Sequence, residues 1–111
     1  MSTPAPGSLE LAVLLAVVRL GDDAYGLAVR RDVSARAGRA YSVGAIYTTL
    51  QRLEDKGLVS SRATDPLPVR GGRSRRLYAG SAVGRRAVRE AQQRAAAVWA
   101  GIDSTPFPSP A

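Results

Sequence analysis

The sequence predicts a mainly α-helical domain that contains a single two-stranded β-hairpin. Four stretches carry apolar residues at helical spacing, and each follows a residue that can cap a helix. Two short segments between the third and fourth stretches, 58–62 and 76–79, suit β-strands, and a linker rich in Pro and Gly separates them. The length of 111 residues fits one domain with one modest core.

The composition favours a polyanionic partner and argues against an enzyme. Sixteen Lys and Arg residues against nine Asp and Glu give a formal net charge of +7, which favours nucleic acid, with an anionic membrane surface second. The sequence has no His and no Cys, which excludes imidazole bases, thiol nucleophiles and structural zinc sites. The only adjacent carboxylates on one predicted helix are Glu54 and Asp55, so we expect no catalytic residues, metal or cofactor.

The first eight residues are expected to form a flexible arm. They contain Pro and Gly and lack the basic start of a signal peptide. The apolar run 11–18 is much shorter than the roughly 20 residues that a membrane span needs. We therefore expect a cytoplasmic protein that does not associate with membranes.

The first predicted helix covers residues 9–20, with Ser8 as its N-cap. Only Glu10 and Arg19 are polar, so the helix is apolar on nearly every side. A chain of this size has too few other elements to cover such a helix, and we expect one face to meet the core and another to meet a second chain. The residues predicted for this dimer interface are Leu11, Leu14, Leu15 and Val18.

The second and third helices follow at short intervals. Asp23 is the expected N-cap of the second, which reaches Ala37 and stops at Gly38. Ser42 caps the third, and Gly57 ends it. The apolar stripe of the third helix consists of Val43, Ile46, Tyr47, Leu50 and Leu53. Its opposite face carries Ala45, Thr48, Thr49, Arg52 and Lys56, and no acid occurs before the last turn.

The hairpin linker and the fourth helix complete the domain. Five arginines crowd the hairpin and its linker, where Asp65 is the only acid; they are Arg62, Arg70, Arg73, Arg75 and Arg76. Ser81 caps a helix expected to reach Ile102, whose narrow apolar stripe suits a seam between two helices. The dimer-interface residues predicted here are Val88, Ala91, Ala95, Val98, Trp99 and Ile102. The tail 103–111 holds three Pro and is expected to be disordered.

Three helices followed by a hairpin with a basic loop are the elements of a winged helix-turn-helix module. The third helix of such a module enters the major groove of DNA, and its first residues approach the base edges. Arginines of the wing reach the flanking backbone or the minor groove. Tyr47 has two interpretations, a half-buried core tyrosine or a hydroxyl donor to a phosphate. The predicted DNA-binding residues are Ser42, Val43, Gly44, Ala45, Tyr47, Thr48, Thr49, Arg52, Arg70, Arg73, Arg75 and Arg76.

Three segments resemble the PadR family of bacterial transcriptional regulators. They are AYGLAVRRDV in the second helix, SVGAIYTTLQRLEDKGLV across the third, and RGGRSRRLY in the wing. The resemblance spans residues 9–100 and is most specific in the string from Ser42 to Glu54 and in the Gly71-Gly72-Arg73 wing. It implies a homodimer with interlocked first and last helices and a recognition helix over 43–56. The single helix after the wing is similar to the small subgroup of the family.

The resulting interpretation is a homodimeric repressor that binds double-stranded DNA at a pseudo-palindromic operator. Its domains are a flexible arm (1–8), a winged helix-turn-helix domain (9–80), a C-terminal dimerisation helix (81–102) and a disordered tail (103–111). Some relatives bind a hydrophobic effector at the dimer interface, so Trp99 is either an interface filler or a stacking surface for a small aromatic effector. A protein-interaction adaptor that has lost specific DNA binding is the alternative function.

Overall fold

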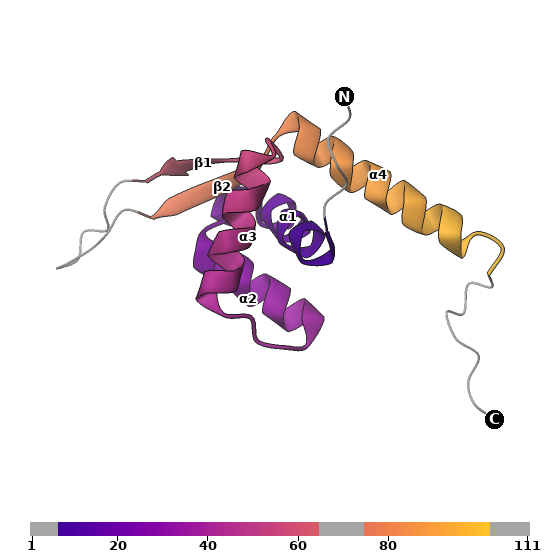
Figure 1. Cartoon of the computed structure of the whole chain (residues 1–111), viewed down its shortest axis with the longest axis horizontal. Helices are drawn as coiled ribbons and strands as arrows, with labels where there is room; N and C mark the ends of the chain where they lie inside the picture. The colour runs from indigo at the N-terminus through magenta and orange to yellow at the C-terminus, as the bar shows by residue number, and fades with distance from the viewer. Residues whose placement is uncertain (1–6, 65–74, 103–111) are drawn as a thin grey trace.

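The computed structural model describes residues 7–64 and 75–102, and within them the expected order of elements is confirmed. The chain is mainly helical with one antiparallel hairpin (Figure 1). The elements are α1 (Ser8–Leu20), a 3-10 turn (Gly21–Asp23), α2 (Gly26–Ala37), α3 (Val43–Asp55), β1 (Val59–Ala63), β2 (Arg76–Gly80) and α4 (Ala82–Trp99). Most of the expected arm, the tip of the wing and the expected disordered tail lie outside the described residues.

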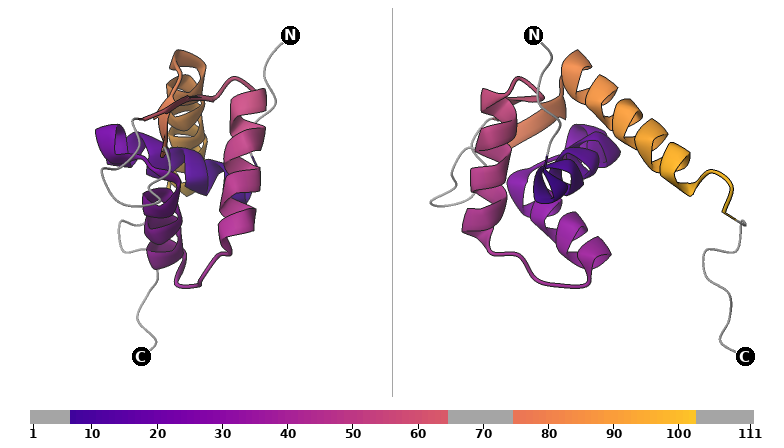
Figure 2. Two further views of the ribbon diagram at one scale, coloured as in Figure 1. Left: turned by 90° about the vertical axis from the view of Figure 1, so that its left-hand side faces the viewer. Right: turned by 45° about the vertical axis from the view of Figure 1, so that its right-hand side comes forward.

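The core forms around α1. Helices α2 and α3 pack against α1, while the hairpin and α4 extend away from them (Figures 1 and 2). The largest fully buried side chains are Val13, Leu14, Val17, Val29, Ile46, Leu50, Leu53 and Leu58. Leu14 therefore fills the core of its own chain, and the prediction that it contacts a second chain is wrong because none of its surface is exposed. Leu11 and Leu15 are half-buried and Val18 is exposed, so they retain surface for a partner.

Two of the four predicted helix caps are confirmed. The Ser42 hydroxyl accepts the backbone N–H of Ala45 at 3.1 Å, and the Ser81 hydroxyl accepts that of Gly84 at 2.9 Å. The other two predictions are wrong. Ser8 is the first residue of α1 itself, and Gly7 occupies the N-cap position without a side-chain hydrogen bond.

The wrong cap at Asp23 has a tertiary cause. Asp23 belongs to the 3-10 turn, and α2 begins three residues later, after Tyr25. Tyr25 forms a β-bridge with Leu77, and the Tyr78 N–H donates to the carbonyl of Ala24 at 3.0 Å. Strand β2 thus engages residues 24 and 25 and holds Tyr25 in an extended conformation (φ −78°, ψ 153°), which delays the helix.

The hairpin and the start of α4 are joined tightly. Strand register runs from Val59 opposite Gly80 to Ala63 opposite Arg76, so β1 begins one residue later than predicted and β2 ends one residue later. The Ser81 hydroxyl also donates to the carbonyl of Gly57 at 2.6 Å. Only glycine fits at position 84, because a methyl group there would overlap the carbonyl oxygen of Leu58.

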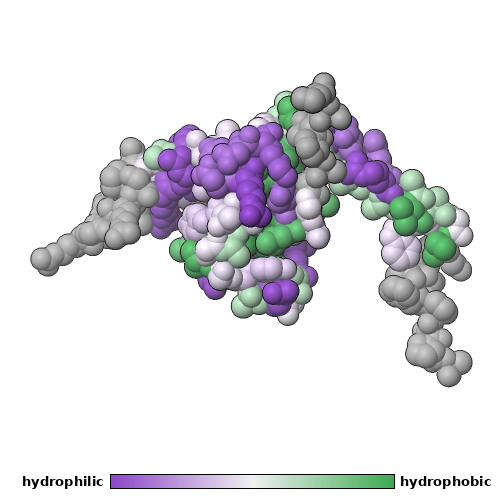
Figure 3. Space-filling model, viewed as in Figure 1, coloured by the Kyte–Doolittle hydropathy of each residue, from purple (hydrophilic) through white to green (hydrophobic). Residues whose placement is uncertain are grey.

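Helix α4 is packed only along its first half. Gly84 is its one buried residue, Ala87 and Val88 pack against the core, and every residue from 92 to 102 is exposed. The helix ends at Trp99, three residues before the predicted end, because the backbone leaves the helical conformation at Ala100 (φ −58°, ψ 134°). Figure 3 shows hydrophobic side chains gathered near the far end of this helix. In the described part of the chain, no helix combines the length and apolarity needed to cross a bilayer.

Candidate nucleic-acid interface

The exposed face of α3 has the character expected of a recognition helix. Ile46, Leu50 and Leu53 bury one side of the helix in the core. The opposite side exposes small, hydroxyl-bearing and polar groups with a single cation; these residues are Gly44, Thr48, Gln51 and Arg52. A methyl group at Gly44 would meet nothing within 4 Å, so this end of the helix is open. The geometry thus leaves Gly44, Thr48 and Arg52 accessible, as the predicted role requires.

The start of α3 is held by contacts that precede it. Tyr41 accepts a hydrogen bond from Arg30 Nε at its carbonyl (2.6 Å), and its own N–H donates to the Ser34 hydroxyl (3.2 Å). The Arg39 guanidinium lies 4.7 Å from the centroid of the Tyr41 ring, within range of a cation–π contact. With the Ser42 cap in place, the N-terminus of α3 and its partial positive charge have a fixed position.

Two residues predicted for the exposed face of α3 are directed elsewhere. Thr49 is 4% exposed, and its hydroxyl donates to the carbonyl of Ala45 at 2.7 Å, so it belongs to the buried side of the helix. The prediction that the Thr49 hydroxyl contacts DNA is wrong, because helical periodicity places position 49 on the same side of α3 as the buried residues Ile46 and Leu53. Lys56 instead forms an ion pair with Glu10 of α1 at 2.7 Å.

Tyr47 is a partly exposed residue that packs across the start of α2. Its side chain is 40% exposed, and its ring covers Gly26 so closely that a methyl group at position 26 would overlap it. The glycine in the Tyr25-Gly26 pair therefore lets the two helices of the helix-turn-helix approach each other. Both interpretations of Tyr47 remain compatible with this position, since the ring is packed and part of it is accessible.

The base of the wing is connected to the recognition helix. The Ser61 hydroxyl on β1 donates to Glu54 of α3 at 2.5 Å, and Arg76 of β2 donates to the same hydroxyl at 2.9 Å. Arg75 lies 5.2 Å from the centroid of the Tyr25 ring. Both arginines are exposed, whereas Arg70 and Arg73 lie outside the described residues.

The arginines of the candidate interface are not taken up by ion pairs in the described part of the chain. Within residues 7–64 and 75–102, the ion pairs join Asp32 to Arg19 and Arg36, and Glu10 to Lys56. The arginines of α3 and β2 thus have no carboxylate at ion-pair distance in this part of the chain.

Burial raises the pKa of the Tyr78 phenol above its usual value, and the nearby Tyr47 raises it further. Tyr78 is therefore a neutral side chain at physiological pH.

Sequence reasoning missed the groups that position the interface. Gly26, Ser61 and the Arg30 contact to Tyr41 were not selected, because their partners lie on other elements. The close approach of Gly26 to the Tyr47 ring is not visible in a helical pattern. No group of three or more Asp or Glu side chains that could hold a metal ion occurs in the described residues.

A known protein family matches most of the chain. The model of the "Transcriptional regulator PadR-like family" matches residues 14–90. A search of curated proteins found no significant match.

Several solved structures share the fold. RosR of H. salinarum aligns with a TM-score of 0.72 at 24% identity, covering 90% of this chain and 83% of that one. A PadR family transcription regulator from Clostridium difficile aligns with a TM-score of 0.64 at 20% identity, covering 83% and 91%. A PadR family transcriptional regulator from Eggerthella lenta aligns with a TM-score of 0.60 at 27% identity, covering 81% and 80%.

Proposed function

Since the chain belongs to the PadR-like family of transcriptional regulators, we propose that it is a repressor that binds a pseudo-palindromic operator as a homodimer. The observation that carries the proposal is the exposed face of α3, which begins with a capped, open N-terminus and has no acid before its last turn. The major groove admits one α-helix, and Thr48 and Arg52 can donate hydrogen bonds to base edges there. The chromosome is the target, so the protein acts in the cytoplasm.

A second copy of the chain supplies the second recognition helix. Val98 is 79% exposed in the half of α4 that has left the core of its own chain, and Ile102, which is 58% exposed, follows the end of the helix. The second half of α4 is a short helical segment without support from its own core, and such a segment is only marginally stable in water unless a partner covers its apolar side. A two-fold axis through this seam presents two copies of α3 about one turn of DNA apart, roughly 34 Å. Binding represses transcription by excluding the polymerase.

Base contacts and phosphate contacts have separable signatures. Arg52 is placed to contact a base edge. Arg52→Ala should therefore reduce the affinity for the preferred duplex, and it should also reduce the ratio of this affinity to that for a scrambled duplex. A mismatch at a single specific contact typically costs about 1–3 kcal/mol. The measurement is a gel shift or fluorescence anisotropy titration on a duplex selected from a random library by the wild-type protein. Arg86→Ala removes the same charge from α4 and serves as the control.

The same titration distinguishes repressor from adaptor. A wild-type protein that prefers no duplex over scrambled DNA would contradict the proposed function and favour the protein-interaction alternative. Equal losses for Arg52→Ala and Arg86→Ala on both duplexes would contradict only the role of Arg52. These two outcomes are separate, since the first concerns the wild-type protein and the second a single side chain.

A small aromatic effector at the dimer seam completes the proposal. Trp99 is 51% exposed at the end of α4, and a flat apolar ring can stack on a planar compound. The alternative role of Trp99 is to fill the interface between two copies. Tryptophan fluorescence titrated with planar aromatic compounds separates the two roles, because only effector binding gives a saturable change that also alters operator affinity.

A further inference from the structure

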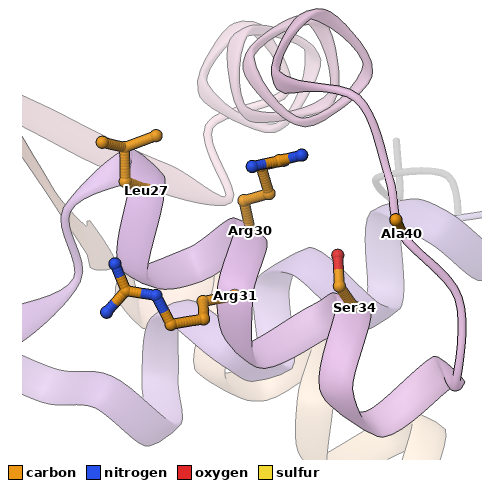
Figure 4. Close-up of a pocket in the computed structure, with 5 residues that line it drawn as sticks. All are labelled: Leu27, Arg30, Arg31, Ser34 and Ala40. Carbon is orange, nitrogen blue, oxygen red and sulfur yellow. The ribbon is translucent and has the colours of Figure 1, made fainter.

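A hollow lined by two arginines lies between the two helices of the helix-turn-helix, beside the turn that connects them. Its volume is about 330 Å³, and it lies between α2 and the segment that leads into α3. Figure 4 shows Arg30 directed toward α3 and Ser34 beside it, with Arg31 on the adjoining side of the helix. The lining residues are Leu27, Arg30, Arg31, Ser34 and Ala40.

The charge in this hollow is not neutralised by the rest of the described chain. Asp32 is the only acid of α2, and it lies on the other side of the helix, where it pairs with Arg19 and Arg36. None of the ion pairs within residues 7–64 and 75–102 involves Arg30 or Arg31. Arg30 and Arg31 therefore bring two positive charges to the hollow without a carboxylate at ion-pair distance in the described residues, and an anion bound there would be stabilised by both.

Arg30 has donors to spare for such an anion. Its Nε–H is used by the carbonyl of Tyr41, which holds the side chain in place. A guanidinium carries five N–H donors, so the four on its terminal nitrogens remain. Their planar arrangement matches two oxygens of a phosphate group. The exposed side chain of Leu27 forms an apolar wall beside them, which limits solvent screening.

The hollow adjoins the segment that leads into the recognition helix, because Ala40 is one of its lining residues. On α2, Asp32 and Arg36 face α1, and Leu27 and Arg31 lie roughly opposite them by helical periodicity. On α3, the exposed residues Thr48 and Arg52 lie opposite the side that is buried against α1. Both surfaces therefore face away from α1.

We infer that this hollow binds one backbone phosphate of the DNA, with Arg30 and Arg31 as its donors. The inference rests on the proposed function, because it requires α3 to lie in the major groove. The first helix of a helix-turn-helix crosses the backbone beside that groove. A phosphate held by Arg30 is one hydrogen bond away from Tyr41 and thus from the start of α3. Its capture fixes the depth and register of the recognition helix without reading sequence.

The test measures affinity and its salt dependence for Arg31→Gln and Arg30→Gln. The DNA probes are the duplex selected by the wild-type protein and its scrambled counterpart. Arg31→Gln should weaken binding to both probes by about tenfold and reduce the log–log salt slope by about 0.9, the value for one phosphate contact. The preference for the selected duplex should persist. Arg31 is exposed, so this variant retains the fold even if Arg30→Gln loosens the turn before α3.

Arg86→Gln is the matched control, since Arg86 is exposed on α4 on the side opposite Val88. Salt slopes of the Arg30 and Arg31 variants equal to that of Arg86→Gln would overturn the phosphate site, even if the wild-type protein binds DNA specifically. A wild-type protein without duplex preference would instead overturn the proposed function itself. Inorganic phosphate, added at constant ionic strength without DNA, should leave the Arg30 Nε–H resonance unshifted; a saturable shift would reassign the hollow to a free anion.

Discussion

At the scale of single residues, two glycines determine how closely the elements of this chain approach each other. Gly26 allows Tyr47 to cross the start of α2, and Gly84 allows the first turn of α4 to rest on the carbonyl of Leu58. The two sites differ in the atoms that would have to move if a methyl group were added. At position 26 the obstacle is the end of a side chain that can rotate away, whereas at position 84 it is backbone. Position 84 is therefore the less tolerant of the two.

Replacing Gly84 by Ala should destabilise the protein by roughly 1–3 kcal/mol or more, because α4 must move away from β1 to accommodate the methyl group. Chemical denaturation at a fixed protein concentration measures the free energy of unfolding. Gly44→Ala is the control, as position 44 is helical and open, and it should be neutral or stabilising by up to about 1 kcal/mol. Equal effects of the two substitutions would show that the contact at Leu58 is unimportant.

At the scale of elements, the wing is positioned by hydrogen bonds from its base to α3 and to the turn before α2. Ser61 joins Glu54 of α3 to Arg76 of β2, and the β-bridge of Tyr25 with Leu77 joins β2 to the turn before α2. Arg76 was predicted to contact DNA. Arg76 is exposed and gives one of its five N–H donors to Ser61, so we propose that it sets the direction of the wing and also contacts DNA.

Ser61→Ala should therefore reduce the part of the DNA affinity that the wing supplies. The expected loss is several-fold on a duplex long enough to reach the wing, and little on a duplex trimmed to the major-groove half-sites. Ser60→Ala provides a close control, since Ser60 is the exposed neighbour on the same strand. If Ser61→Ala weakens binding to the long and the trimmed duplex alike, Ser61 acts through the fold and not through the wing.

At the scale of the whole molecule, α4 is the element that connects one copy to the next. Only its first half contacts the chain's own core, and the second half projects with apolar residues toward its end (Figure 2). Leu11 and Leu15 of α1 keep partial exposure and are available to the same partner. The proposed dimer thus uses surfaces that a single chain cannot cover.

Val98→Glu should dissociate the dimer, because a buried carboxylate without a partner is strongly unfavourable. Sedimentation velocity at micromolar concentration reports the change in mass, and affinity for the selected duplex should fall with it. Gln93→Glu introduces the same carboxylate on the opposite side of α4 and should leave the dimer intact. A wild-type protein that sediments as a monomer would contradict the dimer directly.

The sequence by itself determined the order of elements, the caps at Ser42 and Ser81, and the exposure of Gly44, Thr48 and Arg52. These features are local, since they depend on helical periodicity and on side chains within three residues of the backbone that they cap. Only the tertiary structure decided the rest. Strand β2 displaced the start of α2, the core enclosed Leu14 and Thr49, and Glu10 turned Lys56 toward α1. Each of these depends on a contact between residues far apart in the chain, which no local pattern specifies.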